Sequence, residues 1–393
     1  MKRLLIGAAV LAVLAIAAVP GWRWWAADRA EQQHVDRNET EVRVGLTKGP
    51  YQVYESGSTL DRARLIRQGA SGSLWIARGA YFMTVRDGAL DLYYPVPILG
   101  YRLGPDRDGT FVVTVRPAPA SDPPRARPDS PPFAFVPSGQ FLIGDRANPR
   151  ETHYVWVPAF FISVFEVTNA EFRDFLADSA GYALDSNWTE AGRAWKARNR
   201  SEASALLQPK DAEYKRFGQP DQPVTSVTWF EATAYCRWLT ASVGAARWRF
   251  ALPDDAEWEK AARGPDGFDY GLGAAISDAE IPLYNWKKNP DVPVTVIGWA
   301  DTQRSFSHNR YGVYHASGNV AEWTRSAFWP YNRQQKYSDD RRNDPELSER
   351  RTARGGSWYS ATTAPLYLPY RDAFQPWYHG RDVGFRVVAK PAP

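Results

Sequence analysis

Apolar and polar residues alternate along the first third of the chain, from residue 41 onward. β-branched and aromatic residues recur at strand spacing in SLWIA at 73–77, YFMTV at 81–85 and FVVTV at 111–115, as is typical of half-buried strands. The dipeptides Asp-Gly at 87–88 and 108–109 favour tight turns, because glycine accepts a positive φ. The pattern predicts a small antiparallel β domain over residues 41–117, without a motif that indicates chemistry.

A second pattern predicts three helices. In each, a capping residue is followed three positions later by glutamate, which is the arrangement of a capping box. The pairs are Thr168 with Glu171, Thr228 with Glu231 and Asp254 with Glu257. Apolar residues then recur at helical spacing, and Gly264 is placed to end the third helix. The rest of this region is expected to be loop with short strands.

Proline-rich sequence separates the two patterns. The segment PAPASDPPRARPDSPP at 117–132 favours extended backbone over a packed element. Residues 118–131 are therefore predicted to be a linker between the β domain and a larger domain at 132–393.

The N-terminus has the features of a targeting segment. Lys2 and Arg3 precede an apolar run at 4–19, so we expect these cations to stay in the cytoplasm while the rest crosses the inner membrane. Small residues at 15–17 fit a cleaved signal peptide and a secreted product. A run extended to residue 27, with tryptophans at the membrane interface, fits a single transmembrane anchor. We favour the anchor over 1–27, followed by a polar spacer at 28–40, with the bulk of the protein in the periplasm.

Composition narrows the function classes. The net charge of +4 is small beside 48 basic and 44 acidic side chains, and no basic cluster is interleaved with aromatic residues, so nucleic acid is not an expected partner. The single cysteine, Cys236, rules out an intramolecular disulfide. The 17 Trp, 20 Tyr and 18 Phe suit both irregular cores and binding surfaces.

The large domain carries an ordered series of motifs. They are FVPSGQFLIG at 135–144, FISVFEVTN at 161–169, PVTSVTW at 223–229, AYCRW at 234–238, LPDDAEWE at 252–259, AARG at 261–264, NRYGVY at 309–314, GNVAEW at 318–323, RGGSW at 354–358 and GFR at 384–386. This series resembles the formylglycine-generating enzyme, or sulfatase-modifying factor, family. The resemblance implies an α+β fold of the C-type-lectin-like class over about residues 132–390.

The resemblance also identifies what this chain lacks. The enzymes of the family oxidise a substrate cysteine with copper held by two thiolates, and the matching positions are Ser360 and Pro365. Neither residue is a soft thiolate ligand for Cu(I), so no copper and no formylglycine formation are expected. Cys236 lies on the apolar face of a predicted helix and is interpreted as a buried structural cysteine.

Calcium is the cofactor that the resemblance implies. One site maps to His315, Gly318, Val320 and Glu322, where His315 departs from the pattern because imidazole is a poor calcium ligand. The other maps to Asn285, the carbonyl of Trp286 and Asp291. The alternative is that Glu322 and its neighbours only satisfy loop backbone.

Histidine chemistry is a weaker possibility. His308, His315 and His379 fall in the C-terminal half, but no pair has helical metal-ligand spacing. The paired-histidine motif of the ergothioneine-forming iron enzymes, which share this domain, is absent.

Aromatic residues gather between the last two motifs, along the stretch that lines the substrate groove in the family. Tyr, Trp and Arg contribute most binding energy per residue at interfaces. The candidate binding residues are Trp358, Tyr359, Ser360, Tyr370, Arg371, Trp377, Tyr378, His379 and Arg381. The alternative, that these rings pack the core, applies most to Trp358 and Phe374, whereas the residues from 377 to 381 are expected to be exposed.

Three functional hypotheses follow. The first is a non-catalytic binding or scaffold protein of the cell envelope, whose aromatic groove binds a protein, a peptide or a glycan. The second is an extracytoplasmic enzyme with other chemistry, possible because the family also contains a periplasmic protein without the thiolate pair that matures the siderophore pyoverdine. The third is the variable binding protein of a diversity-generating retroelement, since such proteins share this fold.

Overall fold

The computed structural model describes residues 29–45, 50–70, 72–148, 151–244, 247–276, 308–331 and 340–392. The predicted anchor at 1–27 lies outside these residues, as do Asn285, Trp286 and Asp291. In the described part of the chain, no helix is long and apolar enough to cross a bilayer.

The chain forms two compact units. The first comprises the described parts of 1–45, 71–79 and 98–113, and contains a helical segment at 29–36 and one antiparallel sheet. The strand order of that sheet is β4-β1-β7, with β1 Glu39–Gly45, β4 Gly72–Ala77 and β7 Phe111–Thr114. The ring of Trp75 stacks on that of His34 with a centroid distance of 3.9 Å.

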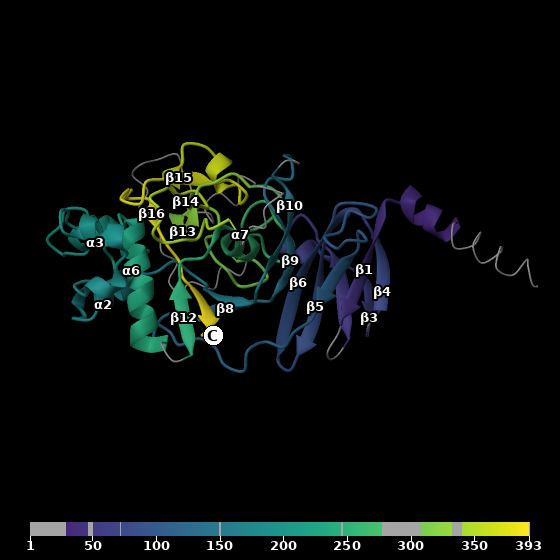
Figure 1. Ribbon diagram of the computed structural model, residues 1–393, viewed down its shortest axis with the longest axis horizontal. Helices are drawn as coiled ribbons and strands as arrows, with labels where there is room; N and C mark the ends of the chain where they lie inside the picture. The colour runs from purple at the N-terminus through teal and green to yellow at the C-terminus, as the bar shows by residue number, and fades with distance from the viewer. Residues whose placement is uncertain are drawn as a thin grey trace, which may run out of the picture. The chain divides into compact units, whose positions relative to one another are not determined.

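The second unit contains four sheets (Figure 1). A four-stranded sheet has the order β3-β2-β5-β6, with β2 Tyr51–Glu55, β3 Arg64–Gly69, β5 Gly79–Asp87 and β6 Leu90–Ile98. A hairpin pairs β9 Gly139–Ile143 with β10 His153–Val157. A third sheet has the order β12-β17-β11-β8, with β8 Phe133–Val136, β11 Phe160–Ser163, β12 Trp248–Ala251 and β17 Val388–Pro391. The fourth has the order β15-β14-β13-β16, with β13 Ala321–Ala327, β14 Arg351–Arg354, β15 Asp372–Phe374 and β16 Val383–Gly384.

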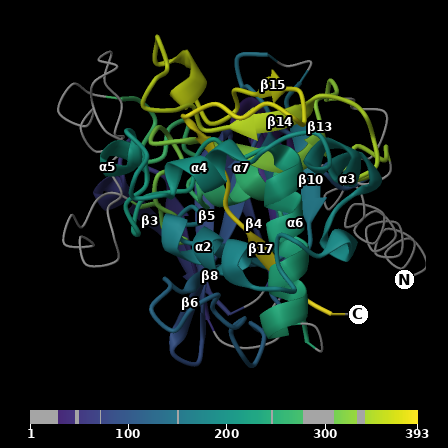
Figure 2. The ribbon, with the colours of Figure 1, turned by 90° about the vertical axis from the view of Figure 1, so that its left-hand side faces the viewer.

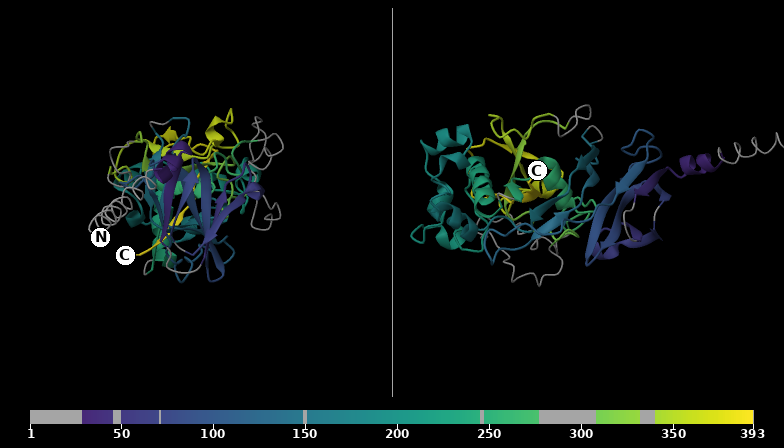
Figure 3. Two further views of the ribbon diagram at one scale, coloured as in Figure 1. Left: turned by 90° about the vertical axis from the view of Figure 1, so that its right-hand side faces the viewer. Right: turned by 60° about the horizontal axis from the view of Figure 1, so that its bottom comes forward.

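The helices of this unit are short. They are α2 Asn169–Ala177, α3 Glu190–Lys196, α4 Glu202–Leu206, α5 Tyr214–Phe217, α6 Trp229–Leu239 and α7 Asp255–Arg263, together with single turns at Leu60–Arg62, Asp185–Asn187, Thr240–Gly244 and Ala364–Leu366. Helix α6 packs against α2, α3, β12 and β13, and the teal helices gather on one side of the unit's strands (Figures 2 and 3).

The three predicted capping boxes are confirmed. They begin α2, α6 and α7, and in each the capping side chain accepts from the backbone of the glutamate while the glutamate accepts from the capping backbone. Gly264 follows α7 at a φ of 64°, as its helix-ending role requires.

The predicted β domain is divided. The hairpin at Asp87 and Gly88 joins β5 to β6, which are paired. The turn at Asp108 and Gly109 does not join paired strands, because β6 and β7 belong to different sheets. Alternation specifies that a segment is a strand but not which strand it pairs with, so the sequence could not separate the two units. The predicted linker contains no helix or strand, and its Arg127 contacts Asp174 of α2 at 2.7 Å.

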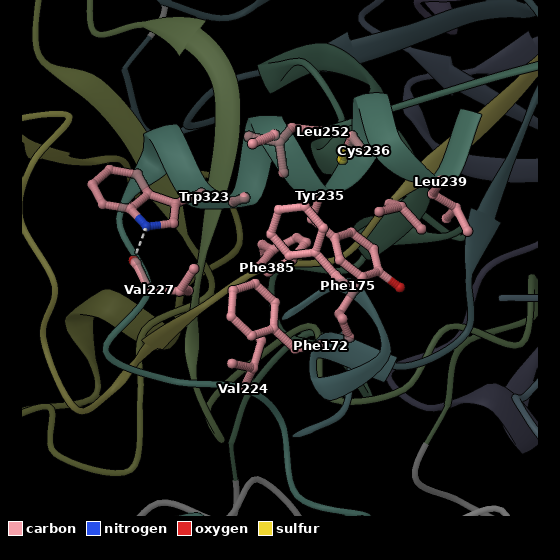
Figure 4. Packing of buried hydrophobic residues seen from close by; sticks show 14 of the residues in the cluster. Phe172, Phe175, Val224, Val227, Tyr235, Cys236, Leu239, Leu252, Trp323 and Phe385 are labelled. Atoms are coloured by element: carbon pink, nitrogen blue, oxygen red, sulfur yellow. Dashed lines mark hydrogen bonds between the residues drawn. The ribbon is translucent and has the colours of Figure 1, made fainter. Parts of the chain in front are cut away.

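Aromatic packing forms the main core of the second unit (Figure 4). Phe172 and Phe175 of α2 meet Tyr235 of α6 and Phe385 from the C-terminal segment, with ring centroids 5.4–6.4 Å apart. The indole of Trp323 donates to the carbonyl of Val227 at 2.9 Å. Burying each such side chain contributes about 1.5–3 kcal/mol.

Helix α7 is buried on every side, although its sequence predicts one buried face. All nine of its residues are inaccessible, so its charged side chains need partners inside the protein. Within the described residues Lys260 forms no ion pair, and it donates instead to the carbonyls of Pro137 at 2.6 Å and Gly139 at 3.1 Å. Burial lowers the pKa of Lys260 from 10.5 to about 7.

This shift predicts a dependence of stability on pH. Between about pH 7 and 10.5 the unfolded chain binds a proton at Lys260 that the folded chain does not, so the free energy of unfolding rises with pH across this window. We expect Lys260→Met to remove this contribution, which amounts to at most about 5 kcal/mol. Urea midpoints of both proteins between pH 6.5 and 10.5 measure it. Equal slopes for wild type and variant would contradict the prediction.

Candidate functional site

The turn after β14 is the centre of the candidate site. Gly355 and Gly356 have φ values of 87° and 64°, which side-chain-bearing residues rarely adopt. A Cβ at Gly355 would lie 2.9 Å from the carbonyl oxygen of Ala316, and one at Gly356 would lie 2.7 Å from the backbone of Pro365. The close approach explains the two glycines of the RGGSW motif.

Serine side chains hold this turn together. The backbone N–H of Ser357 donates to Oγ of Ser360 at 2.9 Å, and Oγ of Ser357 donates to Oδ2 of Asp382 at 2.6 Å. Burial raises the pKa of the Asp382 carboxyl above its usual range. The hydroxyl of Ser360, which the resemblance to the family matched to a thiolate position, therefore supports the turn.

Backbone hydrogen bonds fix the segment before β16. The N–H of Trp229 donates to the carbonyl of Pro376 and that of Ser226 to the carbonyl of Gly380, both at 3.0 Å. The N–H of Ala321 donates to the carbonyl of Asp382 at 2.8 Å. The segment 376–382 is thus anchored on α6 and β13, and the contact between Ser357 and Asp382 ties it to the turn.

Buried rings support exposed ones here. Trp358 is buried among Leu206, Phe217 and Val320, so the core alternative holds for this residue. The ring of Tyr359, which is 62% exposed, lies 5.3 Å from the ring of Trp358.

A second group of rings has the same arrangement. Tyr378 stacks on Phe374 at 4.5 Å, and Phe374 meets the edge of Trp323 at 5.9 Å. Tyr378 is half-buried, and next to it Trp377 is 55% exposed. We call Tyr359, Trp377, His379 and Arg381, all exposed, the aromatic surface.

Two candidate residues have other surroundings. The guanidinium of Arg371 donates to Oδ2 of Asp255 at 2.6 Å and to the carbonyl of Trp329 at 2.8 Å, so its charge stabilises the interior. Tyr370 is 39% exposed and directly precedes it.

Helix α5 adds residues that the sequence reading missed. The guanidinium of Arg216 lies 5.3 Å from the ring centroid of Trp358, and Glu213 lies 3.5 Å from Arg381. No motif marks α5, which has four residues, so only the folded chain places it here.

A buried ion pair lies beneath the site. Both carboxylate oxygens of Glu322 accept from the guanidinium of Arg386, at 2.6 Å each, and Oε2 also accepts from the indole of Trp258 at 2.7 Å. His315 and Asn319, both with positive φ, contact Glu166 at 3.0 and 2.8 Å.

The contacts of Glu322 affect whether this carboxylate can bind calcium. A carboxylate has about four lone-pair positions, and the three donors to Glu322 take most of them while placing a positive charge against it. The described half of the predicted ligand set, Gly318, Val320 and Glu322, therefore does not suit a divalent cation in this arrangement. Within the described residues, no group of three or more His, Cys, Asp or Glu side chains is placed to hold a metal.

The histidines have separate partners. Nδ1 of His308 contacts the carbonyl of Asn309 at 2.7 Å, His315 contacts Glu166, and His379 is exposed. Cys236 is 2% exposed, and burial raises the pKa of its thiol well above the usual range, which confirms it as a buried cysteine.

Comparison with known proteins agrees with the motifs. The family described as the sulfatase-modifying factor enzyme 1-like domain matches residues 119–391. This chain belongs to that family. Its members include the formylglycine-generating enzyme of Streptomyces coelicolor, 30% identical over 287 residues that cover 63% of this chain and 85% of that enzyme.

Two further similar proteins differ from this chain in length or in sequence. Hercynine oxygenase of Mycolicibacterium thermoresistibile is 32% identical over 250 residues, covering 59% of this chain and 50% of that protein. The present chain thus spans about half the length of this relative. The solved structure of Treponema denticola variable protein 1 is 20% identical, with a TM-score of 0.48 and coverage of 66% of this chain and 95% of that one.

The buried ion pair predicts a large loss of stability. Arg386→Gln leaves the Glu322 carboxylate buried without its charge partner, which costs about 3–5 kcal/mol. Arg381→Gln, at an exposed position, is the matched control and should change stability by about 0.5 kcal/mol or less. Urea unfolding of the full-length proteins measures both. Similar midpoints for the two variants would refute this role of Arg386.

Calcium addition tests the metal arrangement. We expect Asn285→Ala, which removes the other predicted site, to show no rise in thermal midpoint when millimolar calcium is added. A cation bound at 100 times its Kd would stabilise the folded state by about 2.7 kcal/mol. A calcium-dependent rise that persists in Asn285→Ala would instead restore the assignment to Glu322.

Proposed function

We propose that this sulfatase-modifying-factor-like protein is a non-catalytic binding or scaffold protein, and that the aromatic surface contacts its partner. The observation that carries the proposal is the exposure of Tyr359 and Trp377. The ring of Tyr359 lies against the buried ring of Trp358, and Trp377 directly precedes Tyr378, which stacks on Phe374. Large exposed rings on a fixed base lose little conformational freedom on binding, and such residues dominate the energy of interfaces.

The backbone around these rings supports the same proposal. Segment 376–382 is held by hydrogen bonds to α6 and β13, and the turn at 355–360 is held by Ser357. A surface that is ordered before binding needs no rearrangement to accept a partner.

The cysteine content argues against the oxidation that gives the family its name. That reaction requires two thiolates, and the chain has one cysteine, which lies in the core. Ser360 and Pro365 occupy the thiolate positions, and Ser360 supports the turn. We therefore propose binding at this place in the fold.

The partner we propose is a protein or peptide of the cell envelope. Aromatic rings together with an arginine match the composition of protein interfaces. The apolar run at 4–19 would tether the protein to the inner membrane and leave the binding surface in the periplasm. A glycan ligand is the alternative outcome of the experiment below.

An enzyme with other chemistry is the second candidate. It is favoured by the identities of about one third to hercynine oxygenase and formylglycine-generating enzyme. Metal analysis of the purified full-length protein tests the metal-dependent form, which requires a stoichiometric transition metal.

Capture of the partner tests the binding proposal. Detergent-solubilised full-length protein is affinity-purified, and co-eluting proteins are quantified by mass spectrometry. We expect a stoichiometric envelope protein that falls at least about tenfold in Tyr359→Ala/Trp377→Ala, because two exposed anchor residues are removed without touching the core.

The matched control is Trp156→Ala. Trp156 is 51% exposed on β10, so its loss controls for the removal of an exposed indole. Equal recovery of the partner by all three proteins would refute the aromatic surface as the binding face. Recovery of the protein without a partner would redirect the test to glycan arrays.

A further inference from the structure

Three buried N–H donors lie together beside the aromatic surface without an acceptor. Nε and Nη2 of Arg216 and Nε1 of Trp358 are inaccessible to solvent and have no hydrogen-bond partner within the described residues. The centre of the Arg216 guanidinium lies 5.3 Å from the ring centroid of Trp358. Trp358 itself is 5% exposed. Buried donors are nearly always paired, because an unpaired one costs about 1–3 kcal/mol.

Two guanidiniums lie next to one carboxylate here. Arg216 and Arg381 share the carboxylate of Glu213, at 3.9 and 3.5 Å. The first distance is too long for a hydrogen bond, so Glu213 does not satisfy the donors of Arg216. The other carboxyl group nearby, that of Asp382, accepts from Ser357, and burial raises its pKa.

The backbone holds the donors in place. The carbonyl of Arg216 accepts from Nε2 of Gln222 at 2.8 Å, and the carbonyl of Phe217 accepts from Nδ2 of Asn169 at 2.6 Å. The ring of Phe217 also packs on this guanidinium, at 5.0 Å. Arg216 is therefore positioned by α2 and by the segment before α6, although α5 has only one turn.

We propose that Arg216 and Trp358 form a carboxylate-recognition site, and that it receives an acidic group of the ligand bound at the aromatic surface. A guanidinium presents paired donors that match the two oxygens of a carboxylate, and the indole adds a third donor, since it can only donate. A carboxylate of the ligand satisfies donors that the described residues leave unpaired. As a statement about the ligand, the inference rests on the proposed function.

The site can be tested without the natural partner. Full-length protein labelled with 5-fluorotryptophan is titrated with N-acetylglutamate amide and, as a neutral isostere, with N-acetylglutamine amide. Each of the 17 tryptophans gives a fluorine resonance. The resonances of Trp358 and Trp377 are assigned from the signals that disappear in Trp358→Phe and Trp377→Phe. We expect a saturable shift of the Trp358 resonance with the glutamate probe and none with the glutamine probe.

Three substitutions separate the site from general charge effects. Arg216→Gln should weaken binding of the glutamate probe at least about tenfold, which corresponds to about 1.4 kcal/mol. Arg350→Gln removes an exposed arginine that lies over a different ring, 5.7 Å from Phe328, and should leave the titration unchanged. Arg216→Lys keeps the charge without the paired donors and should bind the probe with intermediate affinity.

The titration also identifies the source of the carboxylate. N-acetylglycine presents a chain terminus, whereas N-acetylglutamate amide presents a side chain, and the tighter of the two indicates which group the site takes. Equal shifts with the glutamate and glutamine probes, no shift with any probe, or a titration unaffected by Arg216→Gln would each overturn the proposal. Partner capture that depends on Tyr359 and Trp377 would survive those outcomes, so the two proposals fail separately.

Discussion

The buried guanidinium of Arg386 determines how the C-terminal half of this protein is assembled. Besides its two bonds to Glu322, it donates to the carbonyls of Ser163, Val164 and Tyr314 at 2.9–3.3 Å. One side chain thereby joins the end of β11, the loop before GNVAEW, strand β13 and the last segment of the chain. A buried ion pair is a weak source of net stability, but here every hydrogen on the guanidinium has a defined acceptor. The arrangement therefore excludes alternative registers of these segments more than it adds to the free energy of unfolding.

That constraint extends to the candidate site through β13. Because Glu322 is fixed by Arg386, Ala321 next to it can bind the backbone of Asp382, and Asp382 in turn accepts from Ser357. The turn at Gly355 and Gly356 and the segment 376–382 are thus connected to the interior by hydrogen bonds as well as by the packing of Trp358 and Tyr378. The backbone that carries the exposed rings is therefore fixed by contacts with the interior.

Local signals made much of this predictable, and long-range pairing accounts for the rest. Capping boxes and the glycine after α7 act over three or four residues, so the sequence specified them correctly. Burial of Cys236 followed from helical periodicity. The division of the first 117 residues into two units did not follow, because strands of equal alternation can pair in several orders. The role of Arg371 could not be predicted from the sequence either, because its partner Asp255 lies 116 positions away in the chain.

The same difficulty explains why predictions from residue type were wrong for part of the candidate site. Trp358 and Trp377 are both tryptophans of the C-terminal segment, yet one is 5% and the other 55% exposed. The backbone around the two residues differs. The backbone N–H of Trp358 donates to the carbonyl of Asn319. Trp377 instead follows Pro376, whose carbonyl accepts from the backbone N–H of Trp229, the first residue of α6. An aromatic-rich segment thus becomes a surface only where the main chain is held at the rim of the core. In this protein the side chains of Ser357 and Ser360 hold the turn after β14, and the exposed ring of Tyr359 lies in the same turn.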